Sequence, residues 1–434
     1  MSPENPQMQC WIFVFNPLER YMSNYKKIFD AWEEGGVRGI VVGRMFFMND
    51  DDTRVPAVPQ DPKVYSDLGL DAPEEAPRDK EKENALSEML DDARSRGWHI
   101  MVFDSGTTAH VQSLINRYPQ VHGVIIDGPG ENHYELAWHH GGELFQVRDG
   151  ERSQFSEQGF DIDRIERGIA HLRDRFHNLT PDMVRYHAEG GTFGGLILFD
   201  INEDALYWLR ARQEKSINSW KQARESLDKV DRYVELGGIP RITSWSSLTG
   251  QNYQKMPQYF DYIFPKHYYW HRGFDGLYGT VERWVQKFIG WNPSLSEKDA
   301  FLLIKSLFGF QLPGINSLYD LEMGFPEEFF TEFVYGETLR ALDAIKDVDK
   351  TIFWVSTGRF PHAGDPMTAR DLEGILRATQ AAGGTKFLFH PDPDLGASEW
   401  TVISEYCGKR WVQSRNGYWP PDSKIPDEYG REPS

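Results

Sequence analysis

Short apolar runs recur along the chain, separated by segments in which apolar residues have helical spacing. The runs are rich in Val, Ile and Phe and lie at residues 11–15, 39–42, 99–103, 121–126, 239–243, 262–264, 301–304, 352–355 and 386–389. Their uninterrupted apolar character predicts strands buried on both faces, as in a parallel sheet covered by helices. The run at 239–243 is short and contains Pro240, and 196–199 offers one further, weaker run.

The segments between the runs contain helical signals. Residues 162–176 predict a helix with one apolar stripe, formed by Ile162, Ile165, Ile169, Leu172 and Phe176. A second helix is expected to begin at Pro326, because proline suits a first turn and two carboxylates follow it. A third is expected after Thr368, and residues 204–236 read as one long helix.

This alternation of strands and helices predicts an α/β fold, a (β/α)8 TIM barrel with long rim loops. Nine strong runs are one more than such a barrel needs, so at least one predicted strand must be wrong. The alternative is an open doubly wound sheet, but no Gly-x-Gly-x-x-Gly follows the first run. We expect a single barrel domain over 1–415, with loop insertions at 48–82 and 128–159, and an irregular C-terminal tail over 416–434.

The composition limits the classes of binding partner and cofactor that the chain is expected to have. The formal charge of -19 arises from 66 acidic and 47 basic residues and disfavours nucleic acid and anionic lipid surfaces. With only two cysteines, a disulfide framework or four-cysteine zinc site is excluded. The run at 11–15 is too short for a signal segment or membrane span, so a cytoplasmic location is expected. No phosphate-binding loop or metal-ligand spacing is present, so neither a cofactor nor a metal is expected.

Polar residues follow nearly every run, and in a barrel the reacting groups come from these strand ends. Asp127 follows the run at 121–126 and is succeeded by two glycines, Glu131 and His133. Paired carboxylates can act as acid and base, or as acid and nucleophile. The structural alternative is that Asp127 caps the turn through nearby backbone amides.

Other candidates follow the remaining runs. Residues 265–275 alternate aromatic rings with protonatable and cationic groups, a combination that suits the apolar faces and hydroxyl edges of sugars. Asp275 is a further candidate catalytic carboxylate. The candidate substrate-binding residues are Asp104, His133, Lys266, His267, Trp270, His271, Lys305, Arg359, His390 and Asp392.

The acidic, aromatic barrel pattern and the segment Gly123-Val124-Ile125-Ile126-Asp127-Gly128 resemble the glycoside hydrolases built on (β/α)8 barrels. In the α-galactosidase and α-glucosidase type, an Asp that ends the fourth strand is the nucleophile, and the resemblance implies that role for Asp127. The cellulase-like pattern is not matched, since the fourth strand ends in Asp-Gly and Lys305 follows the run at 301–304. The second carboxylate must then be Glu131, Asp275 or Asp392.

The sequence therefore predicts a hydrolase of glycosidic bonds, with a carbohydrate substrate. Two alternatives stay open. One is a lyase, an isomerase or a metal-dependent sugar deacylase on the same barrel, using His267, Lys305 and His390. The other is a carbohydrate-binding protein without catalysis, because a fold alone does not imply a reaction.

Overall fold

The structure is a computed structural model. It describes residues 7–14, 17–49, 53–74, 77–104, 107–136, 144–269, 276–356, 368–391, 395–417, 419 and 421. Nine parallel strand segments form one sheet: β1 (Gln9–Val14), β2 (Val37–Val42), β5 (His99–Phe103), β6 (Gly123–Asp127), β7 (Glu235–Ile239), β8 (Tyr262–Ile263), β9 (Lys266–His267), β10 (Phe353–Ser356) and β11 (Lys386–His390). A small antiparallel pair, β3 (Phe46–Met48) and β4 (Arg54–Pro56), follows β2.

The sheet closes into an eight-stranded barrel, because β8 and β9 are two halves of one strand. β8 pairs with β7, and β9 pairs with β10. The backbone between them bonds to both neighbours: Phe264 N–H donates to Gly238 O at 2.8 Å, and Trp354 N–H donates to Pro265 O at 2.9 Å. β1 pairs with both β2 and β11, so the strands follow one another around the barrel in chain order.

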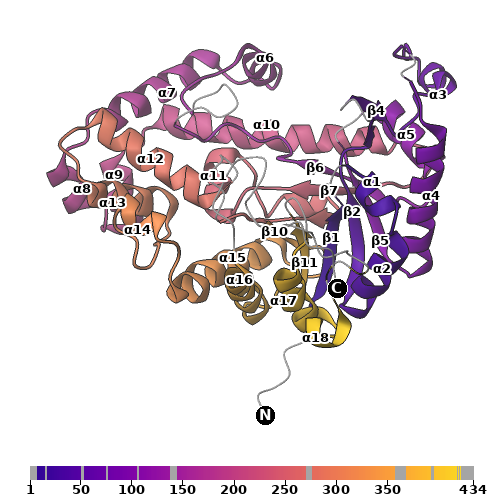
Figure 1. The fold of residues 1–434 in the computed structure, drawn as a ribbon. Coiled ribbons are helices and arrows are strands. Elements are labelled where there is room, and N and C mark those ends of the chain that lie inside the picture. Colours follow the sequence, from indigo (N-terminus) through magenta and orange to yellow (C-terminus); the bar gives the residue numbers. More distant parts are fainter. Residues whose placement is uncertain are drawn as a thin grey trace.

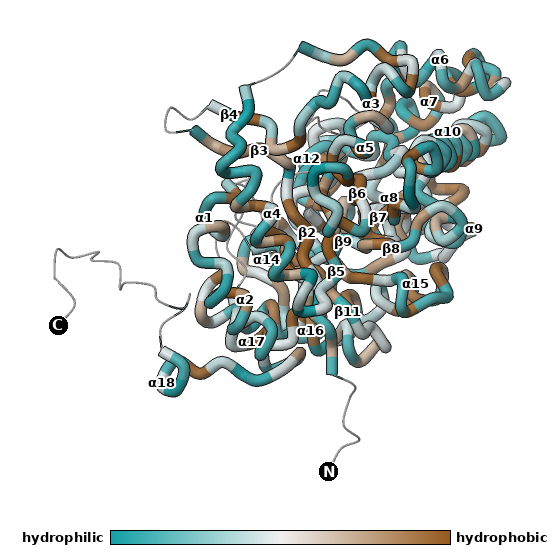
Figure 2. The backbone as a smooth tube through the Cα atoms, turned by 90° about the vertical axis from the view of Figure 1, so that its right-hand side faces the viewer, coloured by the Kyte–Doolittle hydropathy of each residue, from teal (hydrophilic) through white to brown (hydrophobic). Residues whose placement is uncertain are grey.

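The barrel interior is a separate apolar core to which every one of these strands contributes. Its buried members are Trp11, Phe13, Val41, Met101, Ile125, Ile239, Phe264, Tyr268, Ile352, Trp354 and Leu388. A larger core lies between the outside of the sheet and the helices. In Figure 2 the strands are largely brown and central, and the helices around them carry teal on their outward sides. The strands are thus buried on both faces, as their unbroken apolar runs predicted.

Helices surround the barrel (Figure 1). The helices that follow β1, β2, β5, β10 and β11, together with the one before β10, are α1 (Glu19–Met22), α2 (Tyr25–Glu34), α3 (Pro62–Asp67), α4 (Lys80–Ser95), α5 (Thr108–Arg117), α15 (Tyr335–Ile345), α16 (Ala369–Ala381), α17 (Ala397–Cys407) and α18 (Gln413–Asn416). A π-helical segment, Phe329–Val334, leads into α15. The predicted helix starts at Pro326 and Thr368 are confirmed, the second by a capping box between Thr368 and Asp371.

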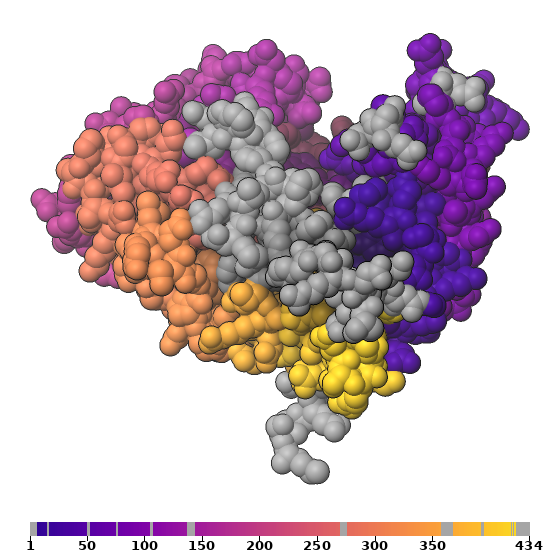
Figure 3. Space-filling model, in the orientation of Figure 1, coloured from indigo at the N-terminus to yellow at the C-terminus, as the bar shows by residue number. Residues whose placement is uncertain are grey.

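A helical extension stands on one side of the barrel, at the left of Figure 1 and in magenta to orange in Figure 3. It is built from two insertions, one after β6 and one after β9, which pack together through α8, α9 and α13. Its helices are α6 (Asp149–Glu157), α7 (Ile162–Phe176), α8 (Pro181–His187), α9 (Gly191–Leu198), α10 (Glu203–Leu227), α12 (Leu277–Trp291), α13 (Glu297–Phe308) and α14 (Leu318–Glu322). The predicted helix at 162–176 is confirmed. The domain limits 1–415 and 416–434 stay a prediction.

Four sequence predictions about elements were wrong. The runs at 301–304 and 196–199 lie in helices α13 and α9, because a stretch of four apolar residues does not distinguish a strand from a buried helix turn. The strand predicted at 239–243 is β7, which ends at Ile239. The long helix predicted over 204–236 ends at Leu227, since β7 begins at Glu235.

Candidate active site

Asp127 ends β6 and faces a buried ammonium group. Its Oδ1 lies 2.8 Å from Nζ of Lys266, whose side chain is 2% exposed, whereas that of Asp127 is 39% exposed. Burial raises the pKa of Asp127, but the charges of Lys266 and Arg241 outweigh it and hold this pKa below its usual value. Burial, followed by the charge of Arg241, lowers the pKa of Lys266 to about 8. The two groups form an accessible carboxylate on a fixed, buried cation.

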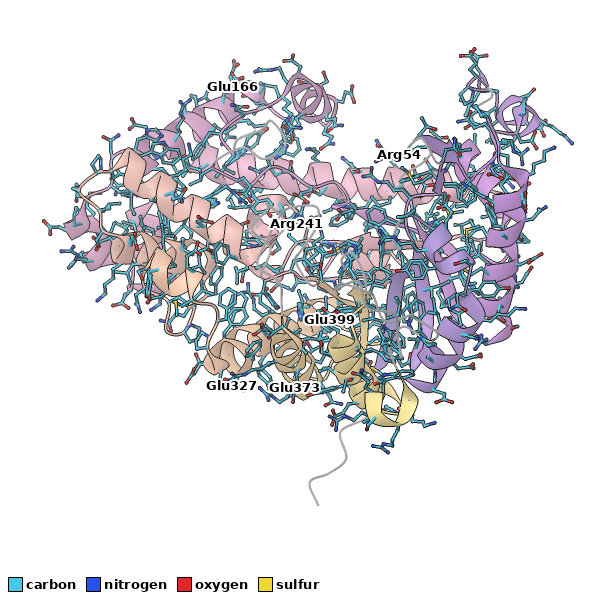
Figure 4. The ribbon with its side chains drawn as sticks, viewed as in Figure 1. Arg54, Glu166, Arg241, Glu327, Glu373 and Glu399 are labelled. Atoms are coloured by element: carbon cyan, nitrogen blue, oxygen red, sulfur yellow. The ribbon has the colours of Figure 1, made fainter. Side chains whose placement is uncertain are left out.

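Glu131 and Arg241 form a second ion pair beside the first. Arg241 Nε lies 2.7 Å from Glu131 Oε2, with side chains 4% and 14% exposed. Arg241 follows β7 and lies near the centre of the molecule in Figure 4. Its backbone N–H donates to Gln251 Oε1 at 3.0 Å, so the loop that presents the guanidinium is anchored. The site therefore combines two carboxylates with two buried cations.

The turn between Asp127 and Glu131 depends on its glycines. Gly128 and Gly130 have φ values of 53° and 64°, in the left-handed region that glycine tolerates best. A Cβ on Gly128 would lie 2.6 Å from Glu131 Oε2, so the carboxylate lies directly over this glycine. The turn is held from outside by Trp220, whose Nε1 donates to Pro129 O at 2.8 Å.

A pocket of about 640 Å³ opens beside Asp127 at the carboxyl ends of the strands. It is lined by Arg44, Met45, Phe46, Phe103, Asp104, His110, Ile125 and Asp127. Asp104 Oδ2 lies 2.6 Å from His110 Nε2. Apolar and aromatic walls with a few convergent polar groups are typical of small-molecule pockets, and this volume lies within their usual range of about 300–1,000 Å³.

Side chains in the sixth barrel strand alternate between interior and exterior. Lys266 points inward to Asp127, and Tyr268 points inward, where its hydroxyl lies 2.8 Å from His390 Nδ1. His267 points outward, with its ring against Phe353 and its Nδ1 3.5 Å from Thr379 Oγ1 on α16. Burial lowers the pKa of His267 to about 3. The structure thus brings Lys266 and His390 to the site, but not His267.

Two further predicted residues lie away from the pocket. Lys305 was expected at a strand end, but it lies in α13 and pairs with Glu189 of the helical extension at 3.1 Å. The ring of His133 contacts Arg148, and its carbonyl accepts from Arg212, so it joins the turn after β6 to α10. Five candidates lie outside the described residues: Trp270, His271, Asp275, Arg359 and Asp392.

Sequence reasoning missed Arg241 and His110. Arg241 was hidden inside the strand predicted at 239–243, although it follows the true end of β7 by two residues. His110 lies in the first turn of α5, and nothing in the sequence connects it to Asp104, which precedes it by six residues. Among the described residues, no group of three His, Cys, Asp or Glu side chains is placed to hold a metal ion. No helix in that part of the chain is long and apolar enough to cross a membrane.

No protein-family model and no curated protein matches the chain. It is similar to the PgaB (BpsB) glycoside hydrolase domain from Bordetella bronchiseptica, with 9% identity, a TM-score of 0.45, and coverage of 94% of this chain and 100% of that chain. It is also similar to the catalytic domain of β-amylase from Paenibacillus polymyxa, with 10% identity, a TM-score of 0.42, and coverage of 92% of this chain and 98% of that chain. The β-galactosidase from Halorubrum lacusprofundi has 12% identity and a TM-score of 0.46, with coverage of 92% of this chain and 58% of that chain. At these TM-scores the likenesses carry no argument about the reaction, and the fold assignment rests on the strand order.

Proposed function

We propose that the protein is a glycoside hydrolase in which Asp127 is the nucleophile or base. The observation that carries the proposal is the environment of Asp127, a partly exposed strand-end carboxylate 2.8 Å from a buried ammonium group and beside a pocket of about 640 Å³. The cations hold the pKa of Asp127 low, so the carboxylate is ionised at neutral pH. An ionised carboxylate is the form that attacks an anomeric carbon or activates water.

The pocket suits a sugar ring. Phe46, Phe103 and Ile125 provide apolar surface for the ring face, while Asp104 and the exposed Arg44 provide polar groups for its hydroxyl edge. Glu131 is held by Arg241 at 2.7 Å, which favours a role in fixing the cations around Asp127. We therefore assign Asp127 to the chemistry and Glu131 to positioning.

The test is a screen of the purified protein against 4-nitrophenyl glycosides of common hexoses and N-acetylhexosamines in both anomers, and against oligosaccharides. We expect release of 4-nitrophenol from at least one glycoside, and a fall in kcat/KM of about 10³-fold or more in Asp127→Asn. Asp200→Asn is the matched control, because Asp200 is 66% exposed and lies in the helical extension. Full turnover by Asp127→Asn would overturn the proposal, and sugar binding without product would favour a non-catalytic binding protein.

A second candidate is a lyase or isomerase that acts on a carbonyl compound through Lys266. The amine would attack the carbonyl carbon, water would leave, and an imine would form. The observation in its favour is the pKa of about 8, which leaves part of the amine neutral near physiological pH. Borohydride reduction in the presence of pyruvate or dihydroxyacetone would then add mass to the peptide that contains Lys266. The corresponding peptide of Lys266→Met would gain no mass.

A further inference from the structure

Asp104 and His110 form a second polar unit in the pocket of Asp127. Asp104 Oδ2 lies 2.6 Å from His110 Nε2, and the two side chains are 16% and 26% exposed. Both residues line the pocket that Asp127 lines. The pair is therefore in reach of whatever occupies the pocket, whereas Glu131 is bound to Arg241 and is not among the residues that line it.

The pair is held on rigid elements close to Asp127. The backbone N–H of Asp104 donates to Ile125 O at 3.1 Å, two residues before Asp127 on the neighbouring strand. His110 lies in the first turn of α5, and its backbone N–H donates to Thr107 Oγ1, the helix cap, at 3.3 Å. Because a strand end and a capped helix turn fix the two residues, the imidazole is presented to the pocket in a defined orientation.

The chemistry of this pair is proton transfer. An imidazole that bonds a carboxylate through Nε2 leaves Nδ1 to give or accept a proton, and the carboxylate orients the ring. Among the described residues, His110 Nδ1 has no recorded hydrogen-bond partner. With Asp127 as the nucleophile, the proposed reaction needs such a group, because a carboxylate that attacks the anomeric carbon cannot also protonate the leaving oxygen.

We infer that His110, oriented by Asp104, is the acid and base of the reaction proposed for Asp127; this inference rests on that proposed function. In the first step an Asp127 oxygen bonds to the anomeric carbon, the glycosidic C–O bond breaks, and the leaving oxygen takes the proton from His110 Nδ1. In the second step His110 Nδ1 takes a proton from water, whose oxygen bonds to the anomeric carbon as the bond to Asp127 breaks. His110 is then a catalytic residue and Asp104 a positioning residue.

Leaving-group dependence tests this role. Wild type, His110→Gln, Asp104→Asn and Asp104→Glu are compared on the phenyl, 4-nitrophenyl and 2,4-dinitrophenyl glycosides of the hexoses used in the screen. Departure of 2,4-dinitrophenolate needs no proton, so we expect kcat/KM to fall about 10²–10⁴-fold in His110→Gln for phenyl glycosides and only a few-fold for 2,4-dinitrophenyl glycosides. Asp104→Asn should follow the same pattern more weakly, and Asp104→Glu should restore part of the rate.

Three controls separate the possible failures. His171→Gln removes another His–Asp pair, with Asp200 at 3.2 Å in the helical extension, and should match wild type on every glycoside. In Asp127→Asn, kcat/KM should fall to a similar extent for glycosides with all three leaving groups. If wild type cleaves no glycoside, the proposed function fails and the dyad with it. If wild type is active but kcat/KM of His110→Gln falls equally for phenyl and 2,4-dinitrophenyl glycosides, or falls for neither, only the assignment of the Asp104–His110 pair is overturned.

Discussion

Replacing Lys266 by Met removes a buried charge from the candidate site, and we expect it to stabilise the fold while abolishing activity. The Lys266 side chain is 2% exposed, and burial, followed by the charge of Arg241, lowers its pKa from 10.5 to about 8. Methionine keeps a flexible unbranched stem, so the packing around the side chain changes little. The variant therefore isolates the cost of the charge.

The magnitude follows from the pKa. At 1.36 kcal/mol per pKa unit, a fall from 10.5 to about 8 corresponds to about 3 kcal/mol of lost stability while the amine is protonated. This shift already includes the attraction of Asp127, whose carboxylate lies 2.8 Å from the ammonium group, so the loss of that pair is not a separate cost. We expect a net gain of at most about 3 kcal/mol at pH 7.

The pH dependence checks the cause. The pKa of Lys266 is lower in the folded than in the unfolded chain, so the penalty is complete below about pH 8 and vanishes as the pH rises past 10.5. Urea unfolding, followed by tryptophan fluorescence, should show the gain at pH 7 and its disappearance near pH 10.5. Lys305→Met is the control, since its pair with Glu189 is 31% and 65% exposed and should change stability by no more than about 0.5 kcal/mol.

A Lys266→Met variant that unfolds at lower urea concentration than wild type at pH 7 would refute this reasoning, because the ammonium would then stabilise the fold. A gain that persists unchanged at pH 10.5 would refute it as well, since the effect would come from packing. Loss of activity without a change in stability would support a catalytic role for the Lys266 charge but contradict the expected cost of its burial to the free energy of unfolding.

Two further predictions concern stability. Burial raises the pKa of Glu135 despite its contacts with Arg283 Nη2 at 2.8 Å and Nε at 3.1 Å, so Glu135→Gln loses the ion pair but also the cost of the buried charge and should change the free energy of unfolding in urea by no more than about 1 kcal/mol; a loss of about 3 kcal/mol or more would contradict this, and the exposed Glu225→Gln is the control. Burial and neighbouring His99 lower the pKa of His122, so its proton binds the unfolded chain more tightly and stability should fall as the pH drops below about 6.5. His122→Gln should flatten this acid limb in thermal melts, and an unchanged slope would contradict the assignment.

The fold could be predicted where the centre of a strand is an apolar run. The runs at 11–15, 39–42, 99–103, 121–126, 352–355 and 386–389 each overlap a barrel strand. β7 was misplaced because its centre is Gly237-Gly238, which gives no apolar signal. A Cβ on Gly237 would lie 2.8 Å from the Phe264 ring, so these glycines are required by close packing that only the assembled barrel reveals.

The candidate site was predictable in part. Asp127 and Lys266 follow apolar runs and were identified, but their contact joins strands that are distant in the sequence. Only part of the helical extension was predicted, as a loop insertion at 128–159 and a helix at 162–176, because its helices pack on each other and not on the barrel alone. Lys266 and His267 were both expected at the site because both follow the run at 262–264, whereas the structure directs Lys266 to the interior and His267 to the outside of the barrel.

Strand alternation explains both the successes and the errors. Along a strand, residues two apart face the same side, so the position two beyond the last interior apolar residue is the first at the rim. This relation holds for five strands, on which Ile125, Ile239, Phe264, Trp354 and Leu388 lie in the interior and Asp127, Arg241, Lys266, Ser356 and His390 follow two residues later. Counting in twos from the apolar interior selects Arg241, which lay inside a predicted strand, and separates Lys266, which faces the site, from His267, which faces outward. Five different strands thus direct a polar group toward one rim, and that convergence is the strongest physical argument that the barrel carries a reaction.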